Sequence, residues 1–290
     1  AEYAGRLEGS ASYRSVFPGV HLKYEARNGL IARLSHSNGI GRPDFGSIMP
    51  NTTVNFSAQT VTLSNPALKP QYSKNYDASL EYYFEPVGLL SVGVFRKNIT
   101  DFIFQDRSRF VGTGAGNGFD GEYAGYNIIT SANGGSARYQ GVEVSFQQQF
   151  TFLPGFWRRF GVNANYTYLS TRGNYGGAAV ATQVAGFKPR TANLGLSYRG
   201  NKAQVVVQGN WVGTWLVSNS TNPALLRYER PRTQWDVKTK YTLSRRVGVF
   251  CDVENLLSAP LNKNYLAYTD RAGQTRLTAP KIVAGVQGRF

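Results

Sequence analysis

Residues 65–104, NPALKPQYSKNYDASLEYYFEPVGLLSVGVFRKNITDFIF, contain two long strand patterns joined by a Pro- and Gly-containing corner at residues 85–88. In the first pattern an apolar, aromatic set alternates with a polar set: Tyr76, Ala78, Leu80, Tyr82 and Phe84 against Asn75, Asp77, Ser79 and Glu81. Successive side chains of a β-strand point to opposite faces, so this strand has one apolar wall and one charged wall. The stretch therefore predicts a long amphipathic hairpin.

The same alternation recurs along the chain. It is found in residues 20–27, 30–34, 140–150, 160–168, 192–198, 203–215, 235–243, 247–254 and 281–290. Short corners, such as Asn28-Gly29, alternate with long excursions, such as residues 39–70 and 256–276. Asn-Gly is the favoured pair for a two-residue hairpin turn. Aromatic residues gather near the short corners, and a second set lies toward the long loops.

Composition excludes several classes of function. A single Cys excludes an internal disulfide and a cysteine-rich metal cluster, and two His make a histidine metal site improbable. We therefore expect no metal and no cofactor. The net charge of +15 comes from Lys and Arg scattered along the chain rather than gathered in one patch, so we expect no nucleic-acid partner. The glycines of residues 112–121 do not fit a phosphate-binding G-x-G-x-x-G motif. No leader is visible before Ala1, and no run of 18 apolar residues could form a membrane helix.

Long strands, alternating loop lengths and two aromatic bands together predict an all-β fold, a transmembrane antiparallel β-barrel. A bilayer offers no water to a free sheet edge, so a spanning sheet must close. We count about 11 strands, whereas bacterial single-chain barrels have even numbers. We therefore expect residues 1–290 to be the C-terminal part of a barrel and not to close alone. Short turns would be periplasmic and long loops extracellular.

Several segments are similar to one family. NPALKP, NYDASLEYYFEP and GLLSVGVFRKNITDFI resemble the hallmark segment of TonB-dependent outer-membrane receptors, and GRPDF, YQGVEVSFQQQF, ANYTYLS, VENLL and VQGRF resemble its later signatures. The most similar subgroup is the Xanthomonas/Caulobacter type, often tied to carbohydrate uptake. The resemblance implies a 22-stranded barrel with an N-terminal plug, of which this chain supplies roughly strands 12 to 22. The plug and the TonB box have no counterpart here.

The resemblance also implies location and partners. We expect the bacterial outer membrane, with membrane lipid and lipopolysaccharide around the barrel, the TonB complex acting through the missing plug, and a small-molecule nutrient as ligand. Phe290 matches the terminal aromatic that the barrel assembly machinery reads. The expected ligand is a carbohydrate; a siderophore or iron complex is the alternative, and a passive porin-like barrel is a further one. The +15 charge would be balanced by an acidic missing half, or would face lipopolysaccharide or anionic substrates.

No catalytic residues are expected. Asp252 and Glu254 share the polar face of a strand, where ion pairing is more plausible than acid–base chemistry, and the same holds for Glu143, Glu81 and Asp77. No G-x-S-x-G elbow is present. Ligand contacts are expected from loop aromatics, with loop packing or membrane-interface positions as the alternative for each. The candidates are Phe119, Tyr123, Tyr126, Tyr175, Tyr228, Tyr265 and Tyr268.

Overall fold

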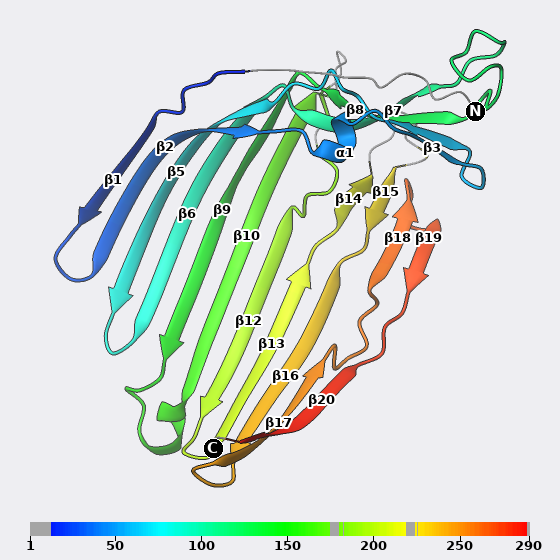
Figure 1. Ribbon diagram of the computed structural model, residues 1–290. Helices are drawn as coiled ribbons and strands as arrows, with labels where there is room; N and C mark the ends of the chain where they lie inside the picture. The colour runs from blue at the N-terminus through cyan, green and yellow to red at the C-terminus, as the bar shows by residue number, and fades with distance from the viewer. Residues whose placement is uncertain (1–12, 175–179, 182, 219–223, 225, 289–290) are drawn as a thin grey trace.

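A large curved antiparallel sheet forms the body of the computed structural model, which describes residues 13–174, 180–181, 183–218, 224 and 226–288 (Figure 1). Among these residues the sheet is 12-stranded: β11 (Val180–Ala181) pairs with β10, and the other strands follow one another across the sheet. In that order they are β1 (Gly19–Glu25), β2 (Leu30–Gly41), β5 (Gln71–Phe84), β6 (Gly88–Thr100), β9 (Ser136–Gln149), β10 (Phe160–Asn174), β12 (Arg190–Arg199), β13 (Ala203–Val212), β16 (Arg232–Thr242), β17 (Val247–Glu254) and β20 (Lys281–Gly288).

Short and long connections alternate, as the sequence predicted. The hairpins β1–β2, β5–β6, β9–β10, β12–β13 and β16–β17 all turn at the lower end of the sheet in Figure 1, and the long connections leave from the upper end. The first turn has Asn28 at φ 76° and Gly29 at φ 77°, the pair of left-handed conformations that a type I′ turn requires. The longest of the short connections, between β9 and β10, carries the 3₁₀ helix η1 (Gly155–Arg159).

The sheet is not closed. Within the described residues its path ends at β1 and at β20, which pair only with β2 and β17, respectively. Both therefore present a free row of backbone donors and acceptors. This agrees with the expectation that the chain cannot complete a barrel alone.

One face of the main sheet is apolar and exposed, and we call it the lipid face. It carries Leu80, Leu196, Ile282 and Val286, whose exposed fractions are 49%, 48%, 67% and 71%. The opposite face, which we call the lumenal face, carries the alternate residues, including Asp77, Asp236 and Asp252. The separation of faces expected for β5 is thus found: Tyr76, Ala78, Leu80, Tyr82 and Phe84 lie on the lipid face.

Aromatic rings gather at the short-turn end, where the sequence predicted one band. Phe160 lies 5.1 Å from Tyr198 and 5.1 Å from Phe156, and Phe156 lies 5.8 Å from Trp157, measured between ring centroids. Such amphipathic belts mark the membrane–water boundary of outer-membrane barrels.

The long connections build two smaller sheets. The first has the order β3 (Thr52–Asn55), β4 (Thr60–Leu63), β8 (Asn127–Asn133) and β7 (Ile103–Phe110), and helix α1 (Phe45–Ile48) precedes it in the chain. The second has the order β14 (Trp215–Ser218), β15 (Arg227–Glu229), β18 (Asn262–Leu266) and β19 (Ala272–Arg276). None of the helices within the described ranges has the length and hydropathy to cross a membrane.

Two strand limits differ from the sequence pattern. Trp215 continues the alternation of residues 203–211, but β13 ends at Val212, where the amide of Gly213 bonds to the carbonyl of Arg190, and Trp215 starts β14 in another sheet. The hairpin strand expected to reach Phe104 ends at Thr100, because Asp101 adopts φ 53° and turns the chain into β7. The alternation of polar and apolar side chains in the sequence does not reveal such turns of the backbone.

Candidate functional site

A cavity of about 980 Å³ lies on the lumenal face, where the main sheet meets the long connections. Its floor comes from β5, β6, β9 and β10. Its other walls come from β7, from residues 184–187, and from Val217 in β14 and Arg227 in β15 of the second small sheet. The cavity is thus enclosed by segments far apart in the sequence and placed together by the sheet.

The apolar wall of the cavity is the best-buried cluster of the described chain. Its cavity-lining members are Ile99, Phe102, Tyr139 and Val184, with Phe104 and Leu169 packed against them; Ala137 completes the cluster behind the lining. The ring of Tyr139 lies 4.6 Å from that of Phe187. The connection carrying Val184 is held at both ends, because the Val184 amide donates to Thr171 Oγ1 (2.8 Å) and the Gly186 amide donates to the Leu216 carbonyl (2.8 Å). These bonds fix an aromatic surface over the lumen.

The close approach of the Phe95 ring to the backbone at Gly141 shapes the floor of the cavity. Phe95 lies across Gly141 on the neighbouring strand: a Cβ at Gly141 would be 2.7 Å from Phe95 Cζ and 2.2 Å from the Tyr168 carbonyl oxygen. Because glycine has no side chain, the ring can lie flat on the sheet and fill the position. Phe95 therefore forms part of the cavity floor.

Charged groups complete the lining. Lys97, Arg107 and Arg227 contribute positive charge, and Asp77 and Glu143 contribute negative charge. The Nε atom of Arg227 is buried and has no hydrogen-bond partner within the described residues. Because Arg227 also lines the cavity, the positive charge of its guanidinium favours an anionic or acceptor-rich occupant.

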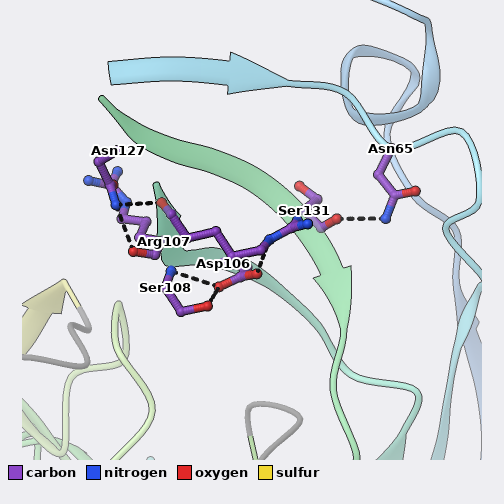
Figure 2. A network of polar contacts seen from close by, with 7 residues as sticks. Asn65, Asp106, Arg107, Ser108, Asn127 and Ser131 are labelled. Atoms are coloured by element: carbon purple, nitrogen blue, oxygen red, sulfur yellow. Dashed lines mark hydrogen bonds and ion pairs between the residues drawn. The ribbon is translucent and has the colours of Figure 1, made fainter. Parts of the chain in front are cut away.

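A bulge in β7 positions Arg107, as Figure 2 shows. The register with β8 shifts between Asp106 and Arg109, and the side-chain amide of Asn127 donates to the carbonyls of Arg107 (2.9 Å) and Arg109 (3.1 Å). Gln105 Oε1 accepts from Arg107 Nε (3.0 Å) and from its second terminal nitrogen (2.7 Å). Bulges re-aim side chains beside binding sites, and this one places Arg107 in the cavity wall.

Asp106 stabilises the same bulge. Its Oδ1 accepts from the Ser108 amide (2.9 Å) and hydroxyl (2.6 Å), and Arg109 lies 3.4 Å from its Oδ2 (Figure 2 shows the Ser108 bonds). Partial burial by itself would raise the pKa of Asp106. The Ser108 hydrogen bonds and the Arg109 charge outweigh that effect and lower the pKa below its usual value.

The loop aromatics expected to bind ligand lie elsewhere. Phe119, Tyr123 and Tyr126 pack on one another in the β7–β8 connection, with ring centroids 5.7 Å and 5.6 Å apart. Tyr228 and Tyr265 stack at 5.5 Å across β15 and β18, and Arg271 lies over the exposed ring of Tyr268. The residues lining the cavity include none of these. Tyr175 and Phe290 lie outside the described residues.

The aromatic residues of the cavity were missed because they lie on strands or beside them. The sequence does carry a signal for Phe95, Ile99 and Tyr139: each is a large apolar residue at a position where the alternation demands a polar one. No comparable signal marks Phe187, because it is not part of an alternating sequence pattern.

Carboxylates of the lumenal face are partly ion-paired, as expected. Glu81 lies 2.9 Å from Arg33, and Glu254 lies 3.5 Å from Lys281. The side chain of Arg33 donates a hydrogen bond to the Glu81 carboxylate (2.9 Å). Across the described segments, no group of three or more His, Cys, Asp or Glu side chains is placed to hold a metal ion.

Comparison with solved structures shows the fold. A mutant of the ferric enterobactin receptor from Pseudomonas aeruginosa has 15% identity and a TM-score of 0.66, covering 94% of this chain and 40% of that one. The copper transporter OprC has 15% identity and a TM-score of 0.67, with 94% and 39% covered. The siderophore receptor PirA from Acinetobacter baumannii has 15% identity and a TM-score of 0.65, with 94% and 41% covered. The chain thus spans about two fifths of the structures it matches.

No curated protein sequence matches the chain significantly. A family model does: the one described as TonB dependent receptor-like, beta-barrel, matches residues 3–256. The match includes the long hairpin, the cavity floor, the first small sheet and strands β14 and β15 of the second, and it ends before β18 and β19. Together with the open, strongly curved sheet and its alternating loops, it establishes that the chain belongs to the TonB-dependent receptor-like β-barrel family.

Proposed function

We propose that residues 1–290 form the C-terminal part of the barrel of an outer-membrane receptor that imports a scarce nutrient, with energy passed through TonB. The family match supports the class of protein. The free edges at β1 and β20 and the coverage of about two fifths of the related structures support a partial barrel. In this proposal the plug and TonB contact belong to the remainder of the receptor, and Phe290 serves barrel assembly.

The proposed ligand is an anionic, aromatic metal complex of the siderophore class. The observation that carries this is the lumenal cavity, where Tyr139, Phe187 and Phe104 stand beside Arg107 and the unpartnered Nε of Arg227. Flat aromatic ligand rings gain from stacking on the first set, and ligand anions gain from the guanidinium groups. Of the similar structures, one is named a ferric enterobactin receptor, one a siderophore receptor and one a copper transporter.

A carbohydrate, expected from the subgroup resemblance, receives less support. Sugar rings also stack on Tyr and Phe, but a neutral sugar leaves the buried Arg227 Nε without a charged partner. The loop aromatics that could stack on sugar rings or other flat ligands pack on one another in the loops, in the three contacts between Phe119 and Tyr123, Tyr123 and Tyr126, and Tyr228 and Tyr265.

Binding to the purified complete receptor tests the proposal. Titration calorimetry would compare a ferric tris-catecholate complex with a neutral maltooligosaccharide of similar size. We expect only the ferric complex to bind, and Arg227→Glu to weaken it about tenfold or more, since a reversed charge repels the anion. Arg271→Glu is the matched control, because Arg271 lies over Tyr268 away from the cavity. Preferential binding of the oligosaccharide, insensitive to Arg227→Glu, would overturn the assignment.

A further inference from the structure

The chain crosses between the main sheet and the first small sheet four times. It leaves β2 for α1, returns from β4 to β5, leaves β6 for β7, and returns from β8 to β9. We call α1, β3, β4, β7 and β8 with their connections, residues 42–70 and 101–135, the first lobe; it lies at the upper end of the main sheet in Figure 1. The last three crossings are residues 64–70, 101–102 and 134–135. The angle between the first lobe and the main sheet therefore depends on what fixes these crossings.

The side chain of Asn133, at the end of β8, joins all three of these crossings. Its Oδ1 accepts from the Lys69 amide (2.9 Å), and its Nδ2 donates to the carbonyls of Lys69 (2.9 Å) and Asp101 (2.9 Å). An Asn side chain offers one acceptor oxygen and two N–H donors, and this geometry uses all three. Exchanging the nitrogen and the oxygen would set the oxygen against two carbonyls, so the orientation of the amide is unambiguous. Asn133 thus holds together the entries to β5, β7 and β9.

The backbone bends sharply at this junction. Asp101 adopts φ 53°, a left-handed conformation that is uncommon for residues other than glycine. Such conformations persist where surrounding bonds fix them, and the Asn133 bond to the Asp101 carbonyl is one of these bonds. The Gly134 amide donates to the Phe102 carbonyl (2.6 Å) and ties the next residue of each crossing together. The direction in which β7 leaves the main sheet is therefore set by the bonds of Asn133 and Gly134.

The residues that follow the junction form a wall of the lumenal cavity. Those that line it directly after Asp101 in the chain are Phe102, Ile103, Phe104, Gln105 and Arg107. The Phe104 ring lies against the junction, because a Cβ at Gly134 would be 3.3 Å from its Cδ1 and Cε1 atoms. Gln71 at the start of β5 also lines the cavity, and its Oε1 accepts from the Ile103 amide (3.1 Å). The lining does not include Asn133, so this residue can act on a ligand only through the segments that it positions.

Side-chain bonds also tie the parts of the first lobe to one another. Asn65 Nδ2 donates to the Ser131 carbonyl (2.9 Å), as Figure 2 shows, and the Asn65 amide donates to the Ser47 carbonyl (2.7 Å). The Ser47 and Ser131 hydroxyl oxygens lie 3.3 Å apart. Strand β8 pairs with both β4 and β7. The first lobe is therefore built to move as one body, and its angle to the main sheet is set at the junction.

We propose that Asn133 is the positioning residue of the lumenal site: by joining three crossings it fixes the first lobe, and with it Phe104 and Arg107 of β7, in the binding position before the ligand arrives. A site held in place in advance binds more tightly, because less conformational freedom is lost on binding. Without the Asn133 amide the cavity residues remain, but on a lobe that samples several angles. The effect on affinity rests on the proposed lumenal ligand, whereas the fixed angle of the first lobe does not.

Distances between two spin labels test the fixed angle in the complete receptor without ligand. Ala58→Cys places one label in the exposed β3–β4 turn, Leu194→Cys places the other on the lipid face of β12, and Cys251→Ser removes the native thiol of this chain. Double electron–electron resonance should give one narrow distance distribution, and a clearly broader one in Asn133→Ala. Asn117→Ala is the matched control, because the Asn117 side chain makes four bonds that all lie within the β7–β8 connection. It should leave the distribution narrow.

Calorimetric titration with the ferric tris-catecholate complex tests the link to the ligand. Asn133→Ala should weaken binding about tenfold, which corresponds to a binding-competent angle populated about one tenth of the time. In an Arg107→Gln background the same change should weaken binding about threefold or less, because the first lobe then lacks the guanidinium that has to be positioned. In an Arg227→Gln background the tenfold loss should persist, since Arg227 lies in β15 of the second small sheet. General destabilisation would give the same loss in both backgrounds.

Three outcomes would overturn the proposal: a broad distribution in the wild type, an unchanged narrow one in folded Asn133→Ala, or equal losses of affinity in the Arg107→Gln and Arg227→Gln backgrounds. Asn133→Asp is the second variant should Asn133→Ala not fold. It keeps the acceptor for the Lys69 amide and loses only the two donors, and its distribution should broaden in the same way. If the receptor binds no ferric complex, the lumenal ligand assignment fails, while the distance distributions still decide whether Asn133 fixes the first lobe.

Discussion

Replacing Asn127 by alanine should loosen β7 and misplace Arg107. Asn127 is the cross-strand clamp of the bulge, because its amide nitrogen donates to both the Arg107 and the Arg109 carbonyls. Alanine keeps the backbone pairing of β8 but removes both donors. The bulge then loses the bonds that hold its shifted register, and the Arg107 side chain loses its fixed approach to the cavity.

The size of the effect follows from the two bonds. Each is a hydrogen bond between neutral groups, worth about 1 kcal/mol net, because the freed carbonyls at this partly exposed strand regain water. About 2 kcal/mol corresponds to about a 30-fold rise in the population of locally opened β7. The main sheet is untouched, so global unfolding should change far less.

Hydrogen–deuterium exchange on the complete receptor is the assay. Amides of residues 103–110 should exchange about 30-fold faster in Asn127→Ala, while β9 and β10 keep their protection. Asn117→Ala is the control, since Asn117 also donates two amide bonds, to Gly112 and Glu122, but within the neighbouring loop. It should speed exchange only there. Unchanged exchange in β7, or the same change in both variants, would refute the clamp.

Three further outcomes are expected. Because the pKa of Asp106 is lowered in the folded state, its contribution to the stability of the β7 bulge is complete above the usual value of 3.8 and is lost as pH falls through the lower folded pKa. Hydrogen–deuterium exchange in β7, corrected for intrinsic rates, should therefore rise below about pH 4. The Asp106→Asn variant should show the same rise at pH 7. Tyr139→Ala removes a side chain that is 7% exposed and packs on Phe187, so it should lower the stability of this packing by about 3 kcal/mol. Protease should therefore cut residues 183–189 faster in Tyr139→Ala than in Tyr123→Ala. The isolated chain of residues 1–290 refolded in detergent should give no monomeric, heat-resistant band, because the β1 and β20 edges are unpaired; such a band would contradict the partial-barrel assignment.

The lipid and lumenal faces could be assigned from sequence with little error. Alternation over Tyr76–Phe84, Val142–Phe146 and Leu194–Tyr198 is a property of single strands, and a strand fixes which side chains share a face whatever its neighbours do. The Asn28-Gly29 turn was equally readable, because few residue pairs accept two left-handed conformations. The expected ion pairing of Glu81 and Glu254 was also confirmed, with Arg33 and Lys281 as partners.

The limits of strands and the membership of the small sheets were not readable. Trp215 keeps the period of β13 yet lies in β14, and Phe104 keeps the period of β6 yet lies in β7. The parallel pairing of β4 with β8 joins residues 67 positions apart, for example Thr60 and Asn127. Contacts across such distances depend on three-dimensional closure, which no local pattern encodes.

The sequence by itself determined an amphipathic, membrane-type antiparallel sheet with short turns at one end, because side-chain alternation and turn chemistry are local. Only the tertiary structure formed the cavity proposed as the binding site. It joined Phe95, Tyr139, Arg107 and Arg227 around one lumenal cavity. The cavity depends on strand register, which sets residues from distant segments side by side, and register is fixed by the pairing of whole strands rather than by any one of them.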